Sequence, residues 1–306
     1  YEEVTAMGFR NIYIENPARL SIKNRQLIIS QDQDISIPVD DIDSIVIDSL
    51  QCTLTAPTIS FLAENQVVLY TCNKQHMPCA VLNPLGNHSR KLIILQNQMG
   101  VTKRFKDRAW QKIIRQKVLN QARCLELTSS PNVAELNRLA TQVLEGDKSF
   151  KESSAAALYF HSLFDTSFNR RHETVHNAAL NYGYAIVRGA ISRDLCAYGF
   201  EPALGIHHHN ELNAFNLADD LIEPFRPYVD LWVAQNVDPE EKVLTSAYKR
   251  ELVSLLFTEV KIDNELHSLT NAIRKTVASY TNCCRNNTTT NLKLPELIPL
   301  RPHEYE

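Results

Sequence analysis

Two segments of this chain bring histidines and carboxylates close together, and each could hold a metal ion. The first is HETVH, residues 172–176. On a helix, the H-E-x-x-H spacing places two imidazoles one turn apart, as in zinc peptidases, but the pattern fixes only three letters and also arises by chance. Glu201 lies far enough downstream to serve as the third protein ligand that such an enzyme needs. The spacing alone therefore leaves a zinc peptidase open.

The second segment, residues 199–227, is richer in polar side chains. Its potential ligands are His207, His208 and His209, followed by Asp219, Asp220 and Glu223. On a predicted helix, both aspartates share a face with Glu223, and like charges on one face repel unless a cation lies between them. Oxygen ligands with one imidazole suit Mg²⁺ or Mn²⁺. Acids also favour a helix N-terminus without any metal, and consecutive histidines occur in solvated loops, so the pattern leaves both explanations open.

The elements that must position these residues change character along the chain. Residues 9–82 form short runs rich in Ile and Val, many of which alternate with polar residues, as strands do. The expected strands cover 10–15, 19–30, 34–39, 43–48, 52–55 and 67–71, with one short helix over 56–65. Several short strands within so few residues predict a small β-sandwich-like domain.

From Arg90 onward the apolar period is that of helices. A long helix carries a stripe formed by Trp110, Ile113, Ile114, Lys117, Val118 and Gln121. Further helices are expected over 132–146, 149–164, 173–198, 217–236, 240–258 and 264–284. The sequence thus predicts an α+β protein, in which an N-terminal β-sandwich-like domain precedes a larger all-α domain.

The expected boundaries follow from the same change of period. Residues 1–6 are expected to be additions before a native start at Met7, and the β domain covers 7–85. A linker over 86–90 leads to the helical domain, 91–290. The Pro-rich tail, 291–306, is expected to be extended or partly disordered.

Composition excludes several classes of protein. With 44% hydrophobic and 22% charged residues, the 306-residue chain has the make-up of a soluble globular protein. Its 8 glycines include neither a dinucleotide-binding nor a P-loop motif. It has neither a signal peptide nor an apolar run of about 18 residues, and its seven cysteines form no regular framework, so we expect a cytoplasmic protein without membrane contact.

Basic residues cluster between positions 90 and 123. Ten Lys and Arg residues stand there against one acid, a net charge of +9 in a chain whose total is −3. A local basic surface of this kind suggests a polyanionic partner. A solvated helix face explains the charge equally well, so the pattern alone does not decide between them.

The residues around the second polar segment resemble a known family. NAALNYGYAIVRGAISRDLCAYGFEPALGIHHHNELNAFNLADDLIEPFRPYVD (177–230) resembles the CRISPR-associated adaptation integrases, the Cas-one family, in their type II branch. KESSAAALYFHSLF (151–164) and the opening MGFRNIYIENPARLSIKNRQLII (7–29) are similar to other parts of that family. The resemblance extends from Met7 to about residue 290. It implies a prokaryotic protein with a β-sandwich-like domain followed by a helical one.

The resemblance also implies a metal site formed by one Glu, one His and one acid. The matching positions are Glu152, His208 and Glu223, and the ion would be Mg²⁺ or Mn²⁺. Asp220 matches a nearby second acid, and family members differ over which acid binds directly. His207 and His209 flank the ligand, so they either support it or are merely exposed.

The implied function is that of a DNA integrase and endonuclease of CRISPR adaptation. Such an enzyme inserts short spacer DNA into the repeat array when a DNA 3′-hydroxyl attacks a phosphodiester; with water as nucleophile it is a nuclease. The implied partners are double-stranded DNA, a second copy in a homodimer, a companion Cas-two dimer and other type II adaptation factors. The alternatives are a non-catalytic DNA-binding scaffold and, less compatible with the resemblance, the zinc peptidase.

With a DNA substrate implied, the basic window becomes a candidate DNA surface. The candidate phosphate contacts are Lys103, Arg104, Lys106 and Arg108, with Arg170 and Arg171 as further candidates. Phe105 or Trp110 could stack on an unpaired DNA end, although Trp110 by itself is more typical of a core.

Overall fold

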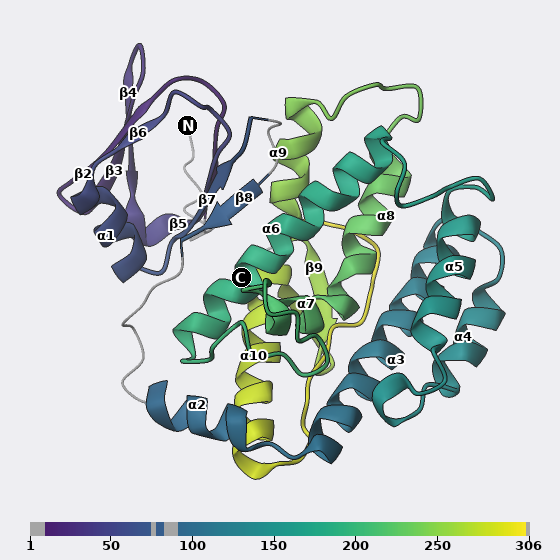
Figure 1. Ribbon diagram of the computed structural model, residues 1–306. Coiled ribbons are helices and arrows are strands. Elements are labelled where there is room, and N and C mark those ends of the chain that lie inside the picture. Colours follow the sequence, from purple (N-terminus) through teal and green to yellow (C-terminus); the bar gives the residue numbers. More distant parts are fainter. Residues whose placement is uncertain (1–9, 75–77, 83–90, 304–306) are drawn as a thin grey trace. The chain divides into compact units, whose positions relative to one another are not determined.

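The computed structural model describes residues 10–74, 78–82 and 91–303 (Figure 1). The described residues before position 88 form one compact unit, and residues 91–302 form another. The expected start at Met7 and the expected linker over 86–90 lie outside the described residues. None of the described helices is long and apolar enough to span a membrane.

The N-terminal unit consists of two four-stranded sheets. The first has the strand order β1-β5-β7-β8, in which β5 runs parallel to both β1 and β7, and β8 is antiparallel to β7. Its strands are β1 (Arg10–Ile14), β5 (Ile42–Ile47), β7 (Val68–Cys72) and β8 (Pro78–Val81). The second has the order β4-β3-β2-β6, from strands β2 (Arg19–Lys23), β3 (Gln26–Ser30), β4 (Asp34–Pro38) and β6 (Thr53–Leu54).

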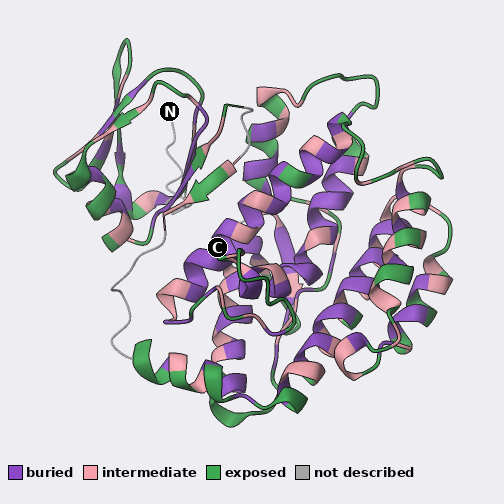
Figure 2. Cartoon of the chain, viewed as in Figure 1, coloured by how far each residue is buried: buried purple, intermediate pink, exposed green. Residues whose placement is uncertain are grey.

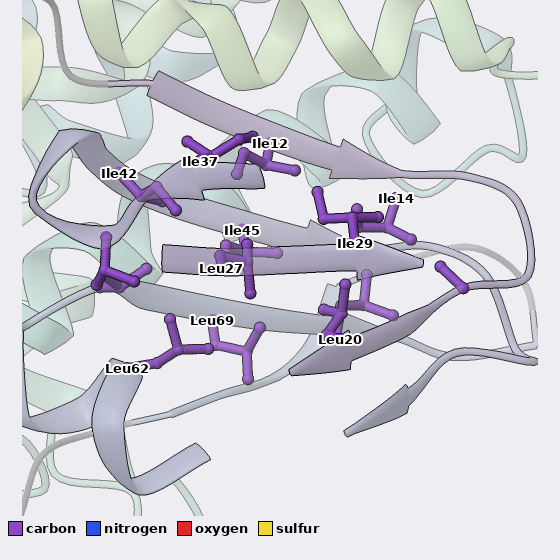
Figure 3. Packing of buried hydrophobic residues seen from close by; sticks show 14 residues of the cluster. Ile12, Ile14, Leu20, Leu27, Ile29, Ile37, Ile42, Ile45, Leu62 and Leu69 are labelled. Atoms are coloured by element: carbon purple, nitrogen blue, oxygen red, sulfur yellow. The ribbon is translucent and has the colours of Figure 1, made fainter. Parts of the chain in front are cut away.

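The apolar residues of both sheets share one core (Figure 3). Ile45 and Leu69 contribute from the first sheet, and Leu20 and Leu27 from the second. Leu62 adds to this core from helix α1 (Ala56–Glu64). The β-sandwich-like domain is thus confirmed, because apolar residues from strands of both sheets pack against one another in this core.

Two details of this unit complete the predicted strands. The run 19–30, in which the sequence predicts a break at Lys23-Asn24, is a hairpin, because Asn24 and Arg25 both adopt positive φ angles, 51° and 60°, as a tight two-residue turn requires. Strand β8 was not predicted, since its four residues, Pro78–Val81, lack the alternation seen elsewhere.

The second unit is mainly helical. Its helices are α2 (Lys91–Gly100), α3 (Lys103–Leu127), α4 (Val133–Thr141), α5 (Lys151–Leu163), α6 (Val175–Ala197), α7 (Asn216–Leu221), α8 (Arg226–Asn236), α9 (Ser246–Ser254) and α10 (Leu269–Asn286). Helices α4 and α5 pack beside α3 (Figure 1), and α6 packs against α7, α8, α9 and α10. Helix α6 is buried over most of its length (Figure 2).

The prediction of an all-α domain was wrong in one place. Residues 259–268 form an antiparallel hairpin of β9 (Glu259–Ile262) and β10 (Glu265–Ser268). Its turn contains Asp263 and Asn264 at positive φ. The expected helices over 240–258 and 264–284 are correspondingly shorter, since α9 begins only at Ser246 and α10 at Leu269.

Two other expected helices are interrupted. The segment 217–236 contains α7, the 3₁₀ turn Glu223–Phe225 and α8, because Pro224 and Pro227 cannot donate the amide hydrogen bonds that a continuous helix needs. The segment 132–146 ends its helix at Thr141, before a 3₁₀ turn over Glu145–Asp147. The first interruption shapes the candidate site, since Glu223 begins the turn between α7 and α8.

As far as Pro302, the tail packs against the rest of the helical unit and is not disordered. Asn120 on α3 donates to the carbonyl of Pro295 at 2.9 Å and accepts from the amide of Leu297 at 3.1 Å. Leu297 is buried. The expected extended conformation is therefore present, but the buried Asn120 fixes it in place.

Candidate active site

A buried lysine joins the two glutamates that the sequence singled out. Lys117 lies on the buried stripe of α3, Glu152 in the first turn of α5 and Glu223 after α7. The Nζ atom of Lys117 lies 2.8 Å from Glu152 Oε1 and 2.5 Å from Glu223 Oε2. Arg226 adds a second cation, its Nε donating to Glu223 Oε1 at 2.9 Å. The four groups form a compensated set of two carboxylates and two cations.

These charges hold one another ionised. Burial would raise the pKa of Glu223, but the neighbouring charges of Arg226 and Lys117 lower it to about 2. Burial would likewise lower the pKa of Lys117, yet Glu223 and Glu152 keep it above the ordinary lysine value. Buried charges persist only when they are paired in this way.

The side chain of Asp147 caps the N-terminus of helix α5, which begins at Lys151. The Asp147 carboxylate accepts the backbone amides of Lys151 and Glu152, at 2.9 and 3.0 Å. These amides are among the unpaired donors of a helix N-terminus. Asp147 therefore fixes the first turn of α5, from which Glu152 reaches Lys117.

His208 is held by Asp220. Asp220 is fully buried, and its carboxylate accepts the backbone amides of Ile206, His207 and His208. Its Oδ1 also lies 2.7 Å from His208 Nδ1. This hydrogen bond raises the pKa of His208 above its ordinary value, although burial opposes it. The Nε2 atom of His208 has no hydrogen-bond partner within the described ranges.

The loop around His208 needs a glycine. A Cβ atom at Gly205 would lie 2.1 Å from the carbonyl oxygen of His208 and 2.9 Å from Asp220 Oδ2. Lys106 on α3 donates to the Gly205 carbonyl at 3.1 Å, which ties the loop to that helix. Asn216 also secures the loop, through the carbonyls of Ala203 and Asn210.

The flanking histidines differ from His208. His207 stacks on Trp110 of α3, with ring centroids 4.2 Å apart and planes 2° from parallel. His209 is exposed. Asp219 accepts from Asn213 at 2.7 Å and lies 3.7 Å from Arg188. His207 thus anchors the loop to α3.

The structure assembles only part of the predicted ligand set. Glu152 and Glu223 meet at Lys117, and His208 meets Asp220. Among the described residues, no group of three or more His, Cys, Asp or Glu side chains is arranged to hold a metal. The role of Asp220 as a direct ligand is not favoured, because both its oxygens already accept hydrogen bonds.

HETVH does not meet the condition that its chemistry requires. Helix α6 begins at Val175 with Thr174 as its N-cap, so His172 and Glu173 precede the helix. The His176 ring packs edge-on against Phe164 at 5.1 Å. The two histidines therefore do not lie one helical turn apart, and the zinc-peptidase alternative loses its structural basis.

Most of the predicted DNA contacts have partners within the protein. Lys103 pairs with Asp107 at 2.8 Å and Arg108 with Glu145 at 2.7 Å. Lys106 holds the Gly205 carbonyl, as described above. Arg170 donates to Asn177 and, at 2.7 Å, to Asn181. Arg104 and Arg171 are exposed, as is Arg115 on α3.

The expected aromatic stacking on a DNA end was wrong. Phe105 and Trp110 are 2% and 1% exposed. Phe105 packs near Tyr280 and Trp110 beneath His207, so both rings belong to the core. The helical stripe itself already indicated this for Trp110, which shares a face with buried Ile113 and Ile114.

Sequence reasoning missed several residues that shape the site. Lys117 was noted as part of an apolar stripe and counted in the basic window, but not as a site residue. A lysine on such a stripe was the available signal, since buried lysines need charged partners. Gly205, Arg226 and Asn216 gave no comparable signal. Their roles depend on contacts across the loop and between helices.

The family to which the chain belongs follows from comparison with known proteins. The family model "CRISPR associated protein Cas1" matches residues 12–260. The chain is 40% identical over 304 residues to the CRISPR-associated endonuclease Cas1 of Neisseria meningitidis serogroup C, covering 98% of this chain and 100% of that protein. The chain therefore belongs to the Cas1 family, as the sequence resemblance implied.

Solved structures agree with this assignment at the level of the fold. A casposase bound to an integration product superposes with a TM-score of 0.78 at 17% identity, covering 97% of this chain and 96% of that one. A Cas1 protein from Thermotoga maritima gives a TM-score of 0.72 at 15% identity, covering 96% and 100%. A Cas6-RT-Cas1–Cas2 complex also gives 0.72 at 15% identity, with 97% of this chain matching 37% of that chain.

Proposed function

We propose that this protein is a metal-dependent DNA integrase and endonuclease of CRISPR adaptation. It inserts short spacer DNA into the repeat array through attack of a DNA 3′-hydroxyl on a phosphodiester. The observation that carries this proposal is the meeting of Glu152 and Glu223 around a cationic group in a chain with full-length similarity to an endonuclease Cas1. The fold it shares with a casposase bound to an integration product supports strand transfer as well as cleavage.

The donor set fits Mg²⁺ or Mn²⁺. Two carboxylates already surround one positive charge, the Lys117 ammonium, and an imidazole nitrogen of His208 remains free of partners in the described part of the chain. Glu152, His208 and Glu223 would hold the ion. When bound, it would polarise the phosphate oxygen and stabilise charge on the attacking and leaving oxygens.

The remaining residues orient these ligands. Because Asp220 accepts at Nδ1 of His208, the proton is fixed on that nitrogen and the Nε2 lone pair remains available. Arg226 holds one oxygen of Glu223, so that the carboxylate cannot rotate freely. Exposed Arg104, Arg115 and Arg171 are the candidates for contacts to DNA phosphates, which would position the duplex without reading its sequence.

The proposed partners are double-stranded DNA from spacer ends and repeat, a second copy of this chain in a homodimer, and a Cas2 dimer. The similarity to a Cas1 chain within a complex that contains Cas2 supports the last of these. Other adaptation factors of type II systems belong to the same proposal, because residues 177–230 resemble the type II branch of the family. The proposed location is the prokaryotic cytoplasm.

Strand transfer tests this function directly. A short duplex with free 3′-hydroxyls would be incubated with a supercoiled, repeat-bearing plasmid, Cas2 and Mn²⁺. Wild type should produce branched product and Glu223→Gln should not, whereas the control Glu173→Gln should retain activity because Glu173 lies outside the site. Absence of product with wild type would favour the alternative of a non-catalytic DNA-binding scaffold.

A further inference from the structure

The most unusual buried group of the site is the side chain of Lys117. It is 9% exposed, and its Nζ atom bridges carboxylates from two elements that are distant in sequence, α5 and the turn after α7. Nothing in helix α3 itself requires a lysine there, since the neighbouring positions of the stripe, Ile114 and Val118, are apolar and fully buried. The lysine therefore stands where two buried carboxylates need a positive charge.

The charges of the site are already balanced without a metal ion. With Arg226, Lys117 balances the two negative charges of Glu152 and Glu223, so the described groups sum to zero without any ion. A divalent cation bound to the same oxygens would stand about 2.0–2.1 Å from them. The ammonium lies 2.5 Å from Glu223 Oε2, and two cations cannot occupy this space together.

Either Lys117 or Arg226 must therefore move away from the carboxylates when a divalent cation binds. Arg226 approaches the opposite oxygen of Glu223 and has a planar guanidinium that also lies over the Tyr184 ring, 4.5 Å from its centroid. Lys117 carries its charge on a flexible four-carbon stem, so its ammonium can withdraw without movement of α3. Lys117 is thus the cation that can be exchanged.

We propose that Lys117 is a positioning residue that occupies the metal position between Glu152 and Glu223 and is displaced when a divalent cation binds. The lysine keeps the two carboxylates together in the metal-free protein and competes with the metal for them. This inference rests on the proposed function, because it takes the two glutamates as metal ligands.

The test is a titration of the full-length protein with Mn²⁺ in the absence of DNA, in which electron paramagnetic resonance measures the free Mn²⁺. Lys117→Met removes the competing charge at nearly constant length. It should bind Mn²⁺ about tenfold more tightly than wild type, because the ion no longer competes with an ammonium for the two carboxylates. Its thermal unfolding temperature should be lower without Mn²⁺ and rise more on Mn²⁺ addition. Lys103→Met, at an exposed lysine, is the matched control and should resemble wild type.

Other variants keep the proposal falsifiable if Lys117→Met folds poorly. Lys117→Arg keeps a permanent positive charge that can donate two parallel hydrogen bonds to a carboxylate. It should therefore bind Mn²⁺ more weakly than wild type. Equal or weaker binding by a folded Lys117→Met, or unchanged binding by Lys117→Arg, would overturn the exchange. If neither wild type nor Lys117→Met bound Mn²⁺, and Glu152→Gln changed nothing, the metal site of the proposed function would itself be refuted, and the exchange with it.

Discussion

Two segments of this protein offer histidines and acids at suggestive spacing, and they differ in what surrounds them. In residues 172–176 the helix begins only at Val175, so His172 lies in a bend before the helix and His176 in its first turn. In residues 205–223 a buried carboxylate gathers three consecutive amides and an imidazole. The difference shows that spacing indicates chemistry only where buried groups fix the backbone.

The largest effect is expected from a substitution at Gly205, where the loop that carries His208 has no room for a side chain. Gly205→Ala would place a Cβ 2.1 Å from the His208 carbonyl oxygen, so the backbone must shift. A displacement of about 1 Å at a reacting site costs roughly 100-fold in rate. We therefore expect strand transfer to fall about 100-fold, while circular dichroism remains native. Gly100→Ala, where a Cβ has open space, is the control and should keep full activity.

Loss of the Asp220 carboxylate should be nearly as severe. Asp220→Asn leaves only one acceptor oxygen for four donors, so His208 loses its orientation. Removal of such a supporting group lowers metal affinity by about 10–100-fold. A Mn²⁺ titration would measure this effect. Asp219→Asn is the neighbouring control, and an equal loss there would show that net charge, not positioning, explains the result.

A third prediction concerns the buried network behind the site. Asp230 accepts hydrogen bonds from Tyr159 and Tyr184, and the Tyr184 ring lies beneath both Arg226 and Arg170. Burial raises the pKa of Asp230 from 3.8 to about 6. The folded state then holds this proton more tightly than the unfolded state. Stability from this group is thus present below pH 3.8 and is lost as the pH rises to about 6.

Urea unfolding between pH 4 and 7 would measure this dependence. Over this interval the wild type should lose about 2.4 kcal/mol relative to Asp230→Asn, which cannot ionise. Asp238→Asn, at an exposed position, should follow wild type. Parallel curves for wild type and Asp230→Asn would show that Asp230 does not titrate in this interval.

The smallest effect is expected in the other segment. Thr174 caps α6 by accepting the amide of Asn177 at 3.2 Å. Thr174→Ala should lower the free energy of unfolding by about 1 kcal/mol and leave strand transfer unchanged. Thermal unfolding and the plasmid assay measure the two quantities separately. A loss of activity without a loss of stability would restore a functional role to residues 172–176.

These contrasts also show which features the sequence could predict. The change from strands to helices was readable, because alternation and helical periodicity are local. The β9–β10 hairpin was missed because Glu265–Ser268 was assigned to the start of the helix expected over 264–284, and the turn at Asp263 and Asn264 was not recognised. The interruption at Pro224 was signalled by the proline itself.

For the site, residue types were predictable but contacts were not. The family resemblance selected Glu152, His208 and Glu223, and two of these meet at Lys117. The partners of the basic residues could not be predicted, because Arg108 reaches Glu145, 37 positions away, across the packing of separate elements. Charge clustering alone therefore overestimated the free basic surface.

The most direct test of the central claim compares the two histidines in one assay. Strand transfer into a repeat-bearing plasmid, with Cas2 and Mn²⁺, would be measured for wild type, His208→Ala and His176→Ala. The account predicts that His208→Ala abolishes transfer and that His176→Ala retains it, since His176 packs edge-on against Phe164, away from the two glutamates at Lys117. Full activity of His208→Ala, or loss of activity only with His176→Ala, would contradict the account.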